Sequence, residues 1–216
     1  MKALIFANGH PKQGAMVYRA LQQARDARVI AVDGGVRLAW FYGRQPHVVI
    51  GDMDSLNPDE LEKARSQGAQ IERHPPEKDE TDLELALIYT VEQGVHWLRI
   101  IGAIGGRFDQ MLANVYLLAL PQLADCDVAI VAGNQTLALL RPGTHTIRGD
   151  VGDTLSLIPI SGDVLGVCTD GLQYALHDET LAFGPARGIS NVLQAGEAQI
   201  KLAEGLLLCV HTEGEA

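Results

Sequence analysis

Residues 29–55 read VIAVDGGVRLAWFYGRQPHVVIGDMDS, and the predicted fold class can be worked out from this stretch. The apolar, β-branched runs at 29–32 and 48–50 are typical of buried strands. Between them, residues 36–42 carry apolar side chains at helical spacing. A strand, a helix and a second strand in this order predict a βαβ unit, in which a crossover helix joins two parallel strands.

The same alternation continues on both sides of this stretch. Helix starts are marked at Asn57, which precedes Pro58, and at Thr81, which stands three residues before Glu84. We therefore predict an α/β N-terminal domain, Rossmann-like, with a mostly parallel sheet and helices on both faces. The further predicted strands are 3–7, 70–72, 98–101 and 128–131, and the further predicted helices are 14–26, 58–67, 82–92 and 110–123.

After residue 133 the pattern changes, because helical periodicity disappears. Short apolar runs are separated there by Gly, Pro and Asp, which predicts an antiparallel, all-β C-terminal sandwich domain. The expected strands are 136–140, 155–159, 164–169, 198–202 and 206–212. We expect two domains, 1–133 and 134–216.

Composition excludes several classes of protein. Among 216 residues, 17 are Lys or Arg and 27 are Asp or Glu, so the formal net charge is −10, which disfavours binding to nucleic acid. No apolar run reaches the length of about 18 residues that a membrane span needs. The three cysteines, Cys126, Cys168 and Cys209, form no metal or disulfide pattern. We expect a soluble, cytoplasmic protein with no nucleic-acid or membrane partner.

Carboxylates and glycines follow the predicted strands. In open parallel sheets, ligands bind beyond the carboxyl ends of the strands. The strand at 29–32 is followed by Asp33, Gly34 and Gly35, and the strand at 98–101 is followed by a glycine-rich segment. The residues of a ligand site are therefore predicted at this edge of the sheet.

Asp52 and Asp54 alternate directly after the strand at 48–50. In an extended chain this spacing places both carboxylates on one side, where they repel each other unless a cation lies between them. Mg²⁺ prefers carboxylate and phosphate oxygens, and Asp82 could add a third ligand. The alternative is that Asp54 and Ser55 cap a turn and that Asp82 interacts with the dipole of its helix.

The segment 102–107, GAIGGR, matches neither a dinucleotide fingerprint nor a P-loop. Its glycines permit close approach of a phosphate to the backbone, and Arg107 could bind phosphate oxygens. The alternative is a glycine turn with a surface arginine.

Six segments, in this order, resemble the thiamine pyrophosphokinase family over nearly the whole chain. The resemblance implies Mg²⁺-dependent transfer of a diphosphoryl group from ATP to the hydroxyl of thiamine, with release of AMP, by a homodimer. It also implies that the first domain binds ATP and metal and that the second binds thiamine and dimerises. The segments are VDGGVRLA (32–39), GDMDSL (51–56), KDETDLELAL (78–87), GAIGGRFDQMLAN (102–114), TDGLQYAL (169–176) and ARGISN (186–191).

The resemblance also implies roles for individual residues. The acidic positions Asp52, Asp54 and Asp82 are expected to bind the metal and, with Asp109, to act in catalysis. Nucleotide contacts are expected from Asp33, Gly34, Gly35, Ser55, Thr81, Gly106 and Arg107. Thiamine contacts are expected from Ser190, Asn191 and an aromatic residue, for which we predict Tyr174, with Phe183 or a residue of the first domain as alternatives. Gln110 departs from the family pattern, in which many bacterial members have His.

Two other functions are compatible with the same residues. A metal-dependent phosphohydrolase would use the same carboxylates with water, instead of the thiamine hydroxyl, as the nucleophile. A non-catalytic module would bind nucleotide or thiamine without turnover. The residues do not identify which carboxylate accepts the proton of the thiamine hydroxyl.

Overall fold

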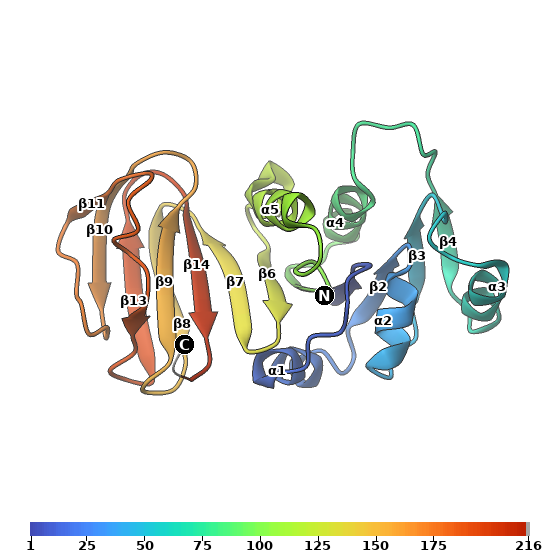
Figure 1. Ribbon diagram of the computed structural model, residues 1–216, viewed down its shortest axis with the longest axis horizontal. Helices are drawn as coiled ribbons and strands as arrows, with labels where there is room; N and C mark the ends of the chain where they lie inside the picture. Colours follow the sequence, from blue (N-terminus) through green and yellow to red (C-terminus); the bar gives the residue numbers. More distant parts are fainter. Residues whose placement is uncertain (215–216) are drawn as a thin grey trace. The chain divides into compact units, whose positions relative to one another are not determined.

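The computed structural model describes residues 1–214, which form two compact units (Figure 1). The first unit is Met1–Gly133, and the second begins at Asn134. None of the helices in residues 1–214 has both the length and the apolar character that crossing a membrane requires.

The first unit contains a six-stranded parallel sheet in the order β6-β5-β1-β2-β3-β4. Its inner strands are almost continuous apolar runs, as expected for a sheet that is buried on both faces. The strands are β1 (Lys2–Phe6), β2 (Arg28–Val32), β3 (Val48–Gly51), β4 (Gln70–Arg73), β5 (Trp97–Ile101) and β6 (Asp127–Ala132).

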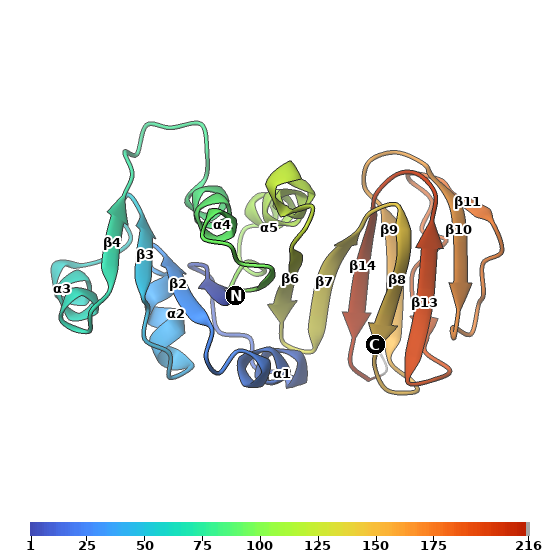
Figure 2. The same cartoon turned by 180° about the vertical axis from the view of Figure 1, so that it is seen from behind.

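Helices cover both faces of this sheet: α1 and α2 lie on one side, and α4 and α5 on the other, in both views (Figures 1 and 2). Leu4 and Phe6 of β1 pack against α1 and α2, while the alternate residues of the strand point to the opposite face. The helices are α1 (Ala15–Gln23), α2 (Gly35–Phe41), α3 (Pro58–Ser66), α4 (Asp82–Glu92) and α5 (Phe108–Tyr116), with 3₁₀ turns η1 (Leu117–Ala119) and η2 (Pro121–Leu123).

The strand order creates a point at which the direction of the chain across the sheet reverses. From β1 the chain moves outward to β4, and it then returns to place β5 and β6 on the other side of β1. The segments that follow β1 and β5 therefore diverge at the carboxyl edge of the sheet. Such a divergence leaves a crevice, which is where open α/β sheets bind ligands.

The second unit is a sandwich of two antiparallel sheets, with orders β12-β9-β14-β7 and β11-β10-β13-β8. Its core is a cluster of buried apolar side chains to which β13 contributes every second residue, namely Ala198, Ile200 and Leu202. The strands are β7 (Gln135–Leu140), β8 (Gly143–Arg148), β9 (Thr154–Pro159), β10 (Val164–Asp170), β11 (Glu179–Leu181), β12 (Asn191–Val192), β13 (Glu197–Leu202) and β14 (Leu207–Thr212).

Three strands of the second unit were not predicted. The strand β8 has few apolar residues and no buried ones, and β11 and β12 have only three and two residues, so none has a period-2 apolar signal. The predicted helix at 110–123 is also interrupted, because the chain bends at Leu120 before Pro121, and proline cannot continue a helix.

Candidate active site

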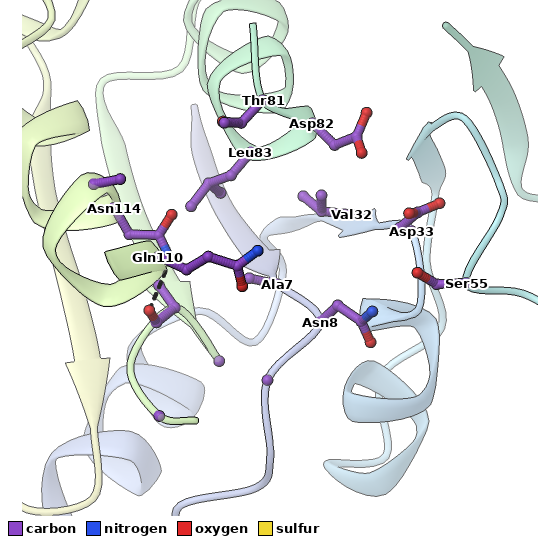
Figure 3. Close-up of a pocket in the computed structure, with 15 residues that line it drawn as sticks. Ala7, Asn8, Val32, Asp33, Ser55, Thr81, Asp82, Leu83, Gln110 and Asn114 are labelled. Atoms are coloured by element: carbon purple, nitrogen blue, oxygen red, sulfur yellow. Dashed lines mark hydrogen bonds between the residues drawn. The ribbon is translucent and has the colours of Figure 1, made fainter. Parts of the chain in front are cut away.

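A cavity of about 290 Å³ opens between the segments that follow β1 and β5 (Figure 3). Gln110 and Asn114 reach into it from α5, opposite Asp33 and Ser55, as the same figure shows. The residues that line it are Ala7, Asn8, Gly9, Val32, Asp33, Ser55, Thr81, Asp82, Leu83, Gly102, Ala103, Gly105, Gln110, Ala113 and Asn114. All of them belong to the first unit.

Glycines allow the two segments to lie close together below the cavity. A Cβ added to Gly9 would lie 2.2 Å from the Gly102 carbonyl oxygen, and Gly102 has a φ of +87°, which favours glycine. The Ala7 N–H donates a hydrogen bond to the Ile101 carbonyl at 2.8 Å. The floor of the cavity is therefore closely packed backbone, and it has no room for larger side chains at these positions.

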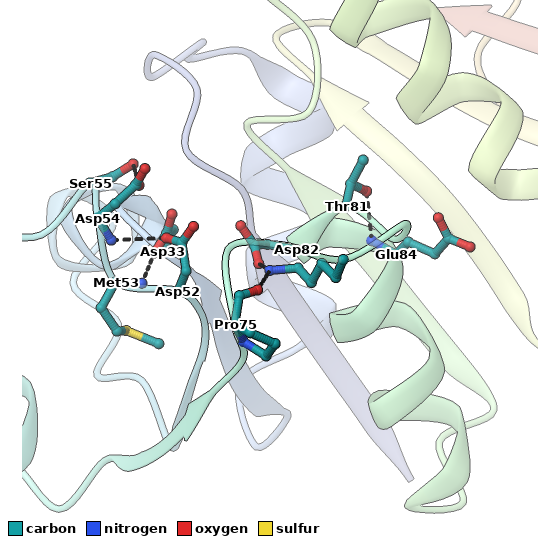
Figure 4. Close-up of polar contacts among 10 residues, drawn as sticks. Asp33, Asp52, Met53, Asp54, Ser55, Pro75, Thr81, Asp82 and Glu84 are labelled. Carbon is teal, nitrogen blue, oxygen red and sulfur yellow. Dashed lines mark hydrogen bonds and ion pairs between the residues drawn. The ribbon is translucent and has the colours of Figure 1, made fainter.

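Three aspartates meet at the edge of this cavity. One carboxylate oxygen from each of Asp33, Asp52 and Asp82 lies within 4.8 Å of the other two (Figure 4). Asp33 is buried, with 6% of its surface exposed. Burial, together with the nearby charges of Asp82 and Asp52, raises the pKa of Asp33 to about 6, although a hydrogen bond from the Met53 N–H opposes this effect. The arrangement is electrostatically unfavourable without a cation.

The backbone that builds this cluster is not extended. Asp33 and Met53 have φ values of +49° and +70°, which place them in the left-handed region. The Met53 N–H donates to Asp33 Oδ1 at 2.9 Å, and the Asp54 N–H turns back to donate to Asp52 Oδ1 at 2.9 Å. Our premise that the alternating aspartates share one side of an extended chain is therefore wrong. Asp54 lies outside the group of three, and its carboxylate accepts a hydrogen bond from Ser55 Oγ at 3.0 Å.

The donors of this cluster fit a hard divalent cation. They are carboxylate oxygens, the ligands that Mg²⁺ prefers. Gly51 keeps space free beside them, since an added Cβ would lie 2.8 Å from Asp33 Oδ1 and 3.4 Å from Asp82 Cγ. Asp82 also accepts a hydrogen bond from Lys78 Nζ at 2.7 Å, so one of the three carboxylates already has a cationic partner.

The other residues predicted next to β2, β3 and α4 have identifiable positions. Ser55 and Thr81 line the cavity, and the Thr81 hydroxyl oxygen accepts a hydrogen bond from the Glu84 N–H, which caps α4 as predicted. Gly34 and Gly35 are not among the residues that line the cavity. Gly35 lets α2 pack on β1, because a Cβ there would lie 2.0 Å from the Phe6 carbonyl oxygen.

The arginine and aspartate of the glycine-rich segment interact with each other. The Arg107 guanidinium donates to both carboxylate oxygens of Asp109, at 3.2 and 2.5 Å, and both side chains are exposed. This pairing raises the pKa of Arg107 and lowers the pKa of Asp109. Gly106 has a φ of +79° and open space around it. None of these residues lines the cavity, although Gly105, next to Gly106, does.

Sequence reasoning missed an amide-lined side of the cavity. Asn8, Gln110 and Asn114 all line it, and Asn114 Nδ2 donates to the Ala103 carbonyl at 2.8 Å. Asn8 lies two residues after the end of β1, so its position near a strand end was a usable signal. Asn114 gave no such signal, because it faces the cavity only through the placement of α5.

The residues predicted to bind thiamine lie together in the second unit. Asn191 Oδ1 accepts a hydrogen bond from the Tyr174 N–H at 2.9 Å, and Asn191 Nδ2 donates to the Tyr174 carbonyl at 2.8 Å. The Tyr174 side chain is 65% exposed. Ser190 has a φ of +56°, and its N–H donates to Ser156 Oγ at 3.0 Å. Phe183, the alternative aromatic residue, is also exposed, at 58%.

Two family models match this chain. The family model described as "Thiamin pyrophosphokinase, catalytic domain" matches residues 19–130, and the one described as "Thiamin pyrophosphokinase, vitamin B1 binding domain" matches residues 144–207. The first model alone covers more than half of the chain.

Similar proteins were found among curated relatives and solved structures. The thiamine pyrophosphokinase of Bacillus subtilis (strain 168) is 28% identical over 184 residues, which are 85% of this chain and 86% of the relative. Thiamine pyrophosphokinase 3 of Oryza sativa subsp. japonica is 30% identical over 161 residues, which are 69% of this chain and 59% of that protein. The crystal structure of thiamine pyrophosphokinase from Bacillus subtilis has a TM-score of 0.87 at 24% identity and covers 99% of both chains, which confirms the predicted fold class.

The order of the six sequence segments, the two-unit fold and both family models lead to one assignment. The chain belongs to the thiamine pyrophosphokinase family of enzymes, as its sequence predicts.

Proposed function

We propose that this chain transfers the diphosphoryl group of ATP to the hydroxyl of thiamine, giving thiamine diphosphate and AMP, and that the reaction requires Mg²⁺. Its place among kinases that make thiamine diphosphate follows from family membership. The single observation that carries the metal requirement is the convergence of Asp33, Asp52 and Asp82 at the edge of a cavity.

We propose Asp33, Asp52 and Asp82 as the metal ligands, so that Asp33 takes the place that we predicted for Asp54. When bound, the divalent cation supplies positive charge to the phosphates and so stabilises the charge that develops during transfer. The carboxylates hold this charge in position at the carboxyl edge of the sheet. A carboxylate at this edge accepts the proton of the thiamine hydroxyl.

The nucleotide contacts are proposed at the same cavity. Ser55 and Thr81 line it, which supports contacts from these residues. Arg107 is held by Asp109, so its guanidinium reaches a phosphate only by exchanging or sharing this partner. A contact from Arg107 or a catalytic role of Asp109 therefore requires a rearrangement of this exposed pair.

The thiamine contacts are proposed in the second unit, at Ser190, Asn191 and Tyr174. The double hydrogen bond between Asn191 and the Tyr174 backbone supports this set, because it holds the backbone of an exposed tyrosine beside a polar turn. We further propose a cytoplasmic homodimer with two small-molecule partners, ATP and thiamine, and no nucleic-acid or membrane partner. Sedimentation analysis of the purified protein tests the homodimer.

The experiment that tests the function identifies the nucleotide product after incubation with ATP, Mg²⁺ and thiamine. We expect AMP and thiamine diphosphate in equal amounts. ADP as the product would contradict diphosphoryl transfer, and phosphate release without thiamine would indicate a hydrolase. Asp52→Asn should abolish turnover. A passive binding module would instead form no AMP even as the wild-type protein, and its ligand binding would be nearly unchanged in Asp52→Asn.

A further inference from the structure

We propose that Lys12 binds the phosphate groups of ATP, an inference that rests on the proposed function. Lys12 lies in the segment that joins β1 to α1, at the carboxyl edge of the parallel sheet. This is the same edge at which the aspartate cluster and the cavity lie. The segment is one of the two that diverge around the cavity.

The ammonium group of Lys12 lies against the glycine-rich segment after β5. A Cβ added to Gly105 would lie 3.4 Å from Lys12 Cε and 3.9 Å from Lys12 Nζ, and Gly105 lines the cavity. The backbone of Lys12 is held, since its carbonyl accepts a hydrogen bond from the Gly133 N–H at 3.2 Å. A short movement of the side chain therefore carries the ammonium group to a phosphate in the cavity.

The charges of the aspartate cluster explain why a further cation is needed. Three ionised carboxylates, the Lys78 ammonium and one divalent cation together carry no net charge. The cluster and its cation therefore supply local positive charge, but no net positive charge, to the phosphates of ATP. Because phosphoryl transfer depends on neutralising the charge of the transferring group, positive charge must come from elsewhere in the site.

Two arginines near the cavity already have partners. Arg107 is paired with Asp109 at 2.5 Å. Arg37 is paired with Glu60 at 2.6 Å and also donates to the Ser55 carbonyl at 2.7 Å. By contrast, the ammonium group of Lys12 makes no hydrogen bond or ion pair with any residue in 1–214. Lys12 is thus available to a phosphate without the loss of an existing contact.

A lysine suits this position chemically. Its ammonium group has three donors on a flexible stem, so it can follow phosphate oxygens as they move during transfer. Hydrogen bonds between charged groups are stronger than those between neutral ones. The contact should therefore contribute to ATP binding and leave thiamine binding unaffected.

The test compares Lys12→Met, which keeps most of the length of the side chain without its charge, with Lys12→Arg. Lys201→Met is the matched control, because Lys201 is an exposed lysine of β13 in the second unit. Binding of α,β-methylene-ATP with Mg²⁺ is measured by calorimetry, since this analogue cannot be cleaved at the reacting bond. The KM values for ATP and thiamine are measured separately from AMP formation.

We expect Lys12→Met to weaken binding of the analogue about 10- to 100-fold, the effect of one lost charge-assisted hydrogen bond. The KM for ATP should rise in parallel, the KM for thiamine should stay within about twofold, and Lys12→Arg should recover most of the loss. Lys201→Met should behave as the wild-type protein does.

Unchanged analogue binding and turnover in Lys12→Met would overturn the proposal. Equal loss in the Met and Arg variants, with a normal melting temperature, would also overturn it, because it would indicate packing and not charge. If the wild-type protein forms no AMP, the proposed function fails. Loss of analogue binding in Lys12→Met would still support Lys12 as a phosphate-binding residue.

Discussion

Asp33→Asn should make the metal-free protein more stable while it weakens metal binding. Asp33 is buried beside two other carboxylates, so its negative charge destabilises the folded state when no cation is bound. Asparagine has nearly the same shape and keeps the oxygen that accepts the Met53 N–H. The substitution therefore removes the charge and preserves the local hydrogen bond.

The magnitude follows from the pKa of Asp33, which rises from 3.8 to about 6 on folding. Each pKa unit corresponds to about 1.4 kcal/mol, so the ionised side chain costs the folded state about 3 kcal/mol. Between these two pKa values the folded state binds more protons than the unfolded state, so stability falls as pH rises through this window. Near pH 8 the whole cost is present, and Asp33→Asn should remove most of it.

Urea unfolding near pH 8 measures this effect, first with a chelator and then with Mg²⁺. In chelator, we expect the free energy of unfolding of Asp33→Asn to exceed that of the wild type by up to about 3 kcal/mol. Mg²⁺ at a hundred times its Kd should stabilise the wild type by about 2.7 kcal/mol and the variant by much less. Asp54→Asn, outside the cluster, should change the chelator value by less than about 0.5 kcal/mol.

Two results would refute this reasoning. One is an Asp33→Asn protein that is less stable than the wild type in chelator, because the charge would then not be unfavourable in the folded state. The other is equal stabilisation of both proteins by Mg²⁺, because Asp33 would then not bind the cation.

Three further predictions concern stability and substrate binding. Asp153→Asn should lower the free energy of unfolding near pH 7 by about 1.5–3 kcal/mol, because the carboxylate is buried and accepts hydrogen bonds from two backbone N–H groups and a buried histidine. Burial alone would raise the pKa of Asp153, but these hydrogen bonds outweigh burial, and the pKa is lowered from its ordinary value of 3.8. In urea titrations the wild type should therefore lose this stabilisation as pH falls below 3.8. Gly102→Ala should lower the free energy of unfolding about 1–3 kcal/mol more than Gly94→Ala does, as measured by thermal unfolding. Both glycines have positive φ, but a Cβ on Gly102 would lie 2.5 Å from a leucine methyl carbon, whereas nothing lies within 4 Å at Gly94. Asn191→Ala should raise the KM for thiamine about tenfold and leave the KM for ATP unchanged in steady-state assays, because the carboxamide holds the backbone of Tyr174.

Each of these predictions has an outcome that contradicts it. A difference between wild type and Asp153→Asn that stays constant down to pH 3 would show that the native carboxylate is not stabilised by its partners. Equal costs at the two glycines would mean that backbone conformation alone matters and that the close packing does not. A parallel rise of both KM values in Asn191→Ala would indicate a general loss of structure.

Much of the first unit could be predicted from local sequence. The apolar runs at 29–32 and 48–50 lie within β2 and β3, because strands buried on both faces carry an uninterrupted apolar signal. The caps at Asn57 and Thr81 are both present, and the Asn57 cap forms a complete capping box with Glu60. Capping depends on residues three positions apart, so the sequence alone contains the necessary information.

The composition of the aspartate cluster could not be predicted in this way. Asp52 and Asp54 seemed equivalent by spacing, but a positive φ at Met53 turns the chain between them. Asp33 joins the cluster because β2 and β3 are neighbours in the sheet and the Asp33 N–H donates to the Ile50 carbonyl at 2.9 Å. That contact spans 17 residues, and no local pattern records it.

The sequence by itself determined the order of strands and helices, the division into an α/β part and a β part, and the supply of acidic residues after the strands. These features depend on apolar periodicity and on interactions between residues a few positions apart. Only the tertiary structure decided which side chains meet. It placed Asn8 and Gln110 in one cavity and set Asn191 against the Tyr174 backbone. The physical reason is that strand pairing and helix packing join segments far apart in the chain, and the direction of each side chain there depends on backbone angles that composition does not specify.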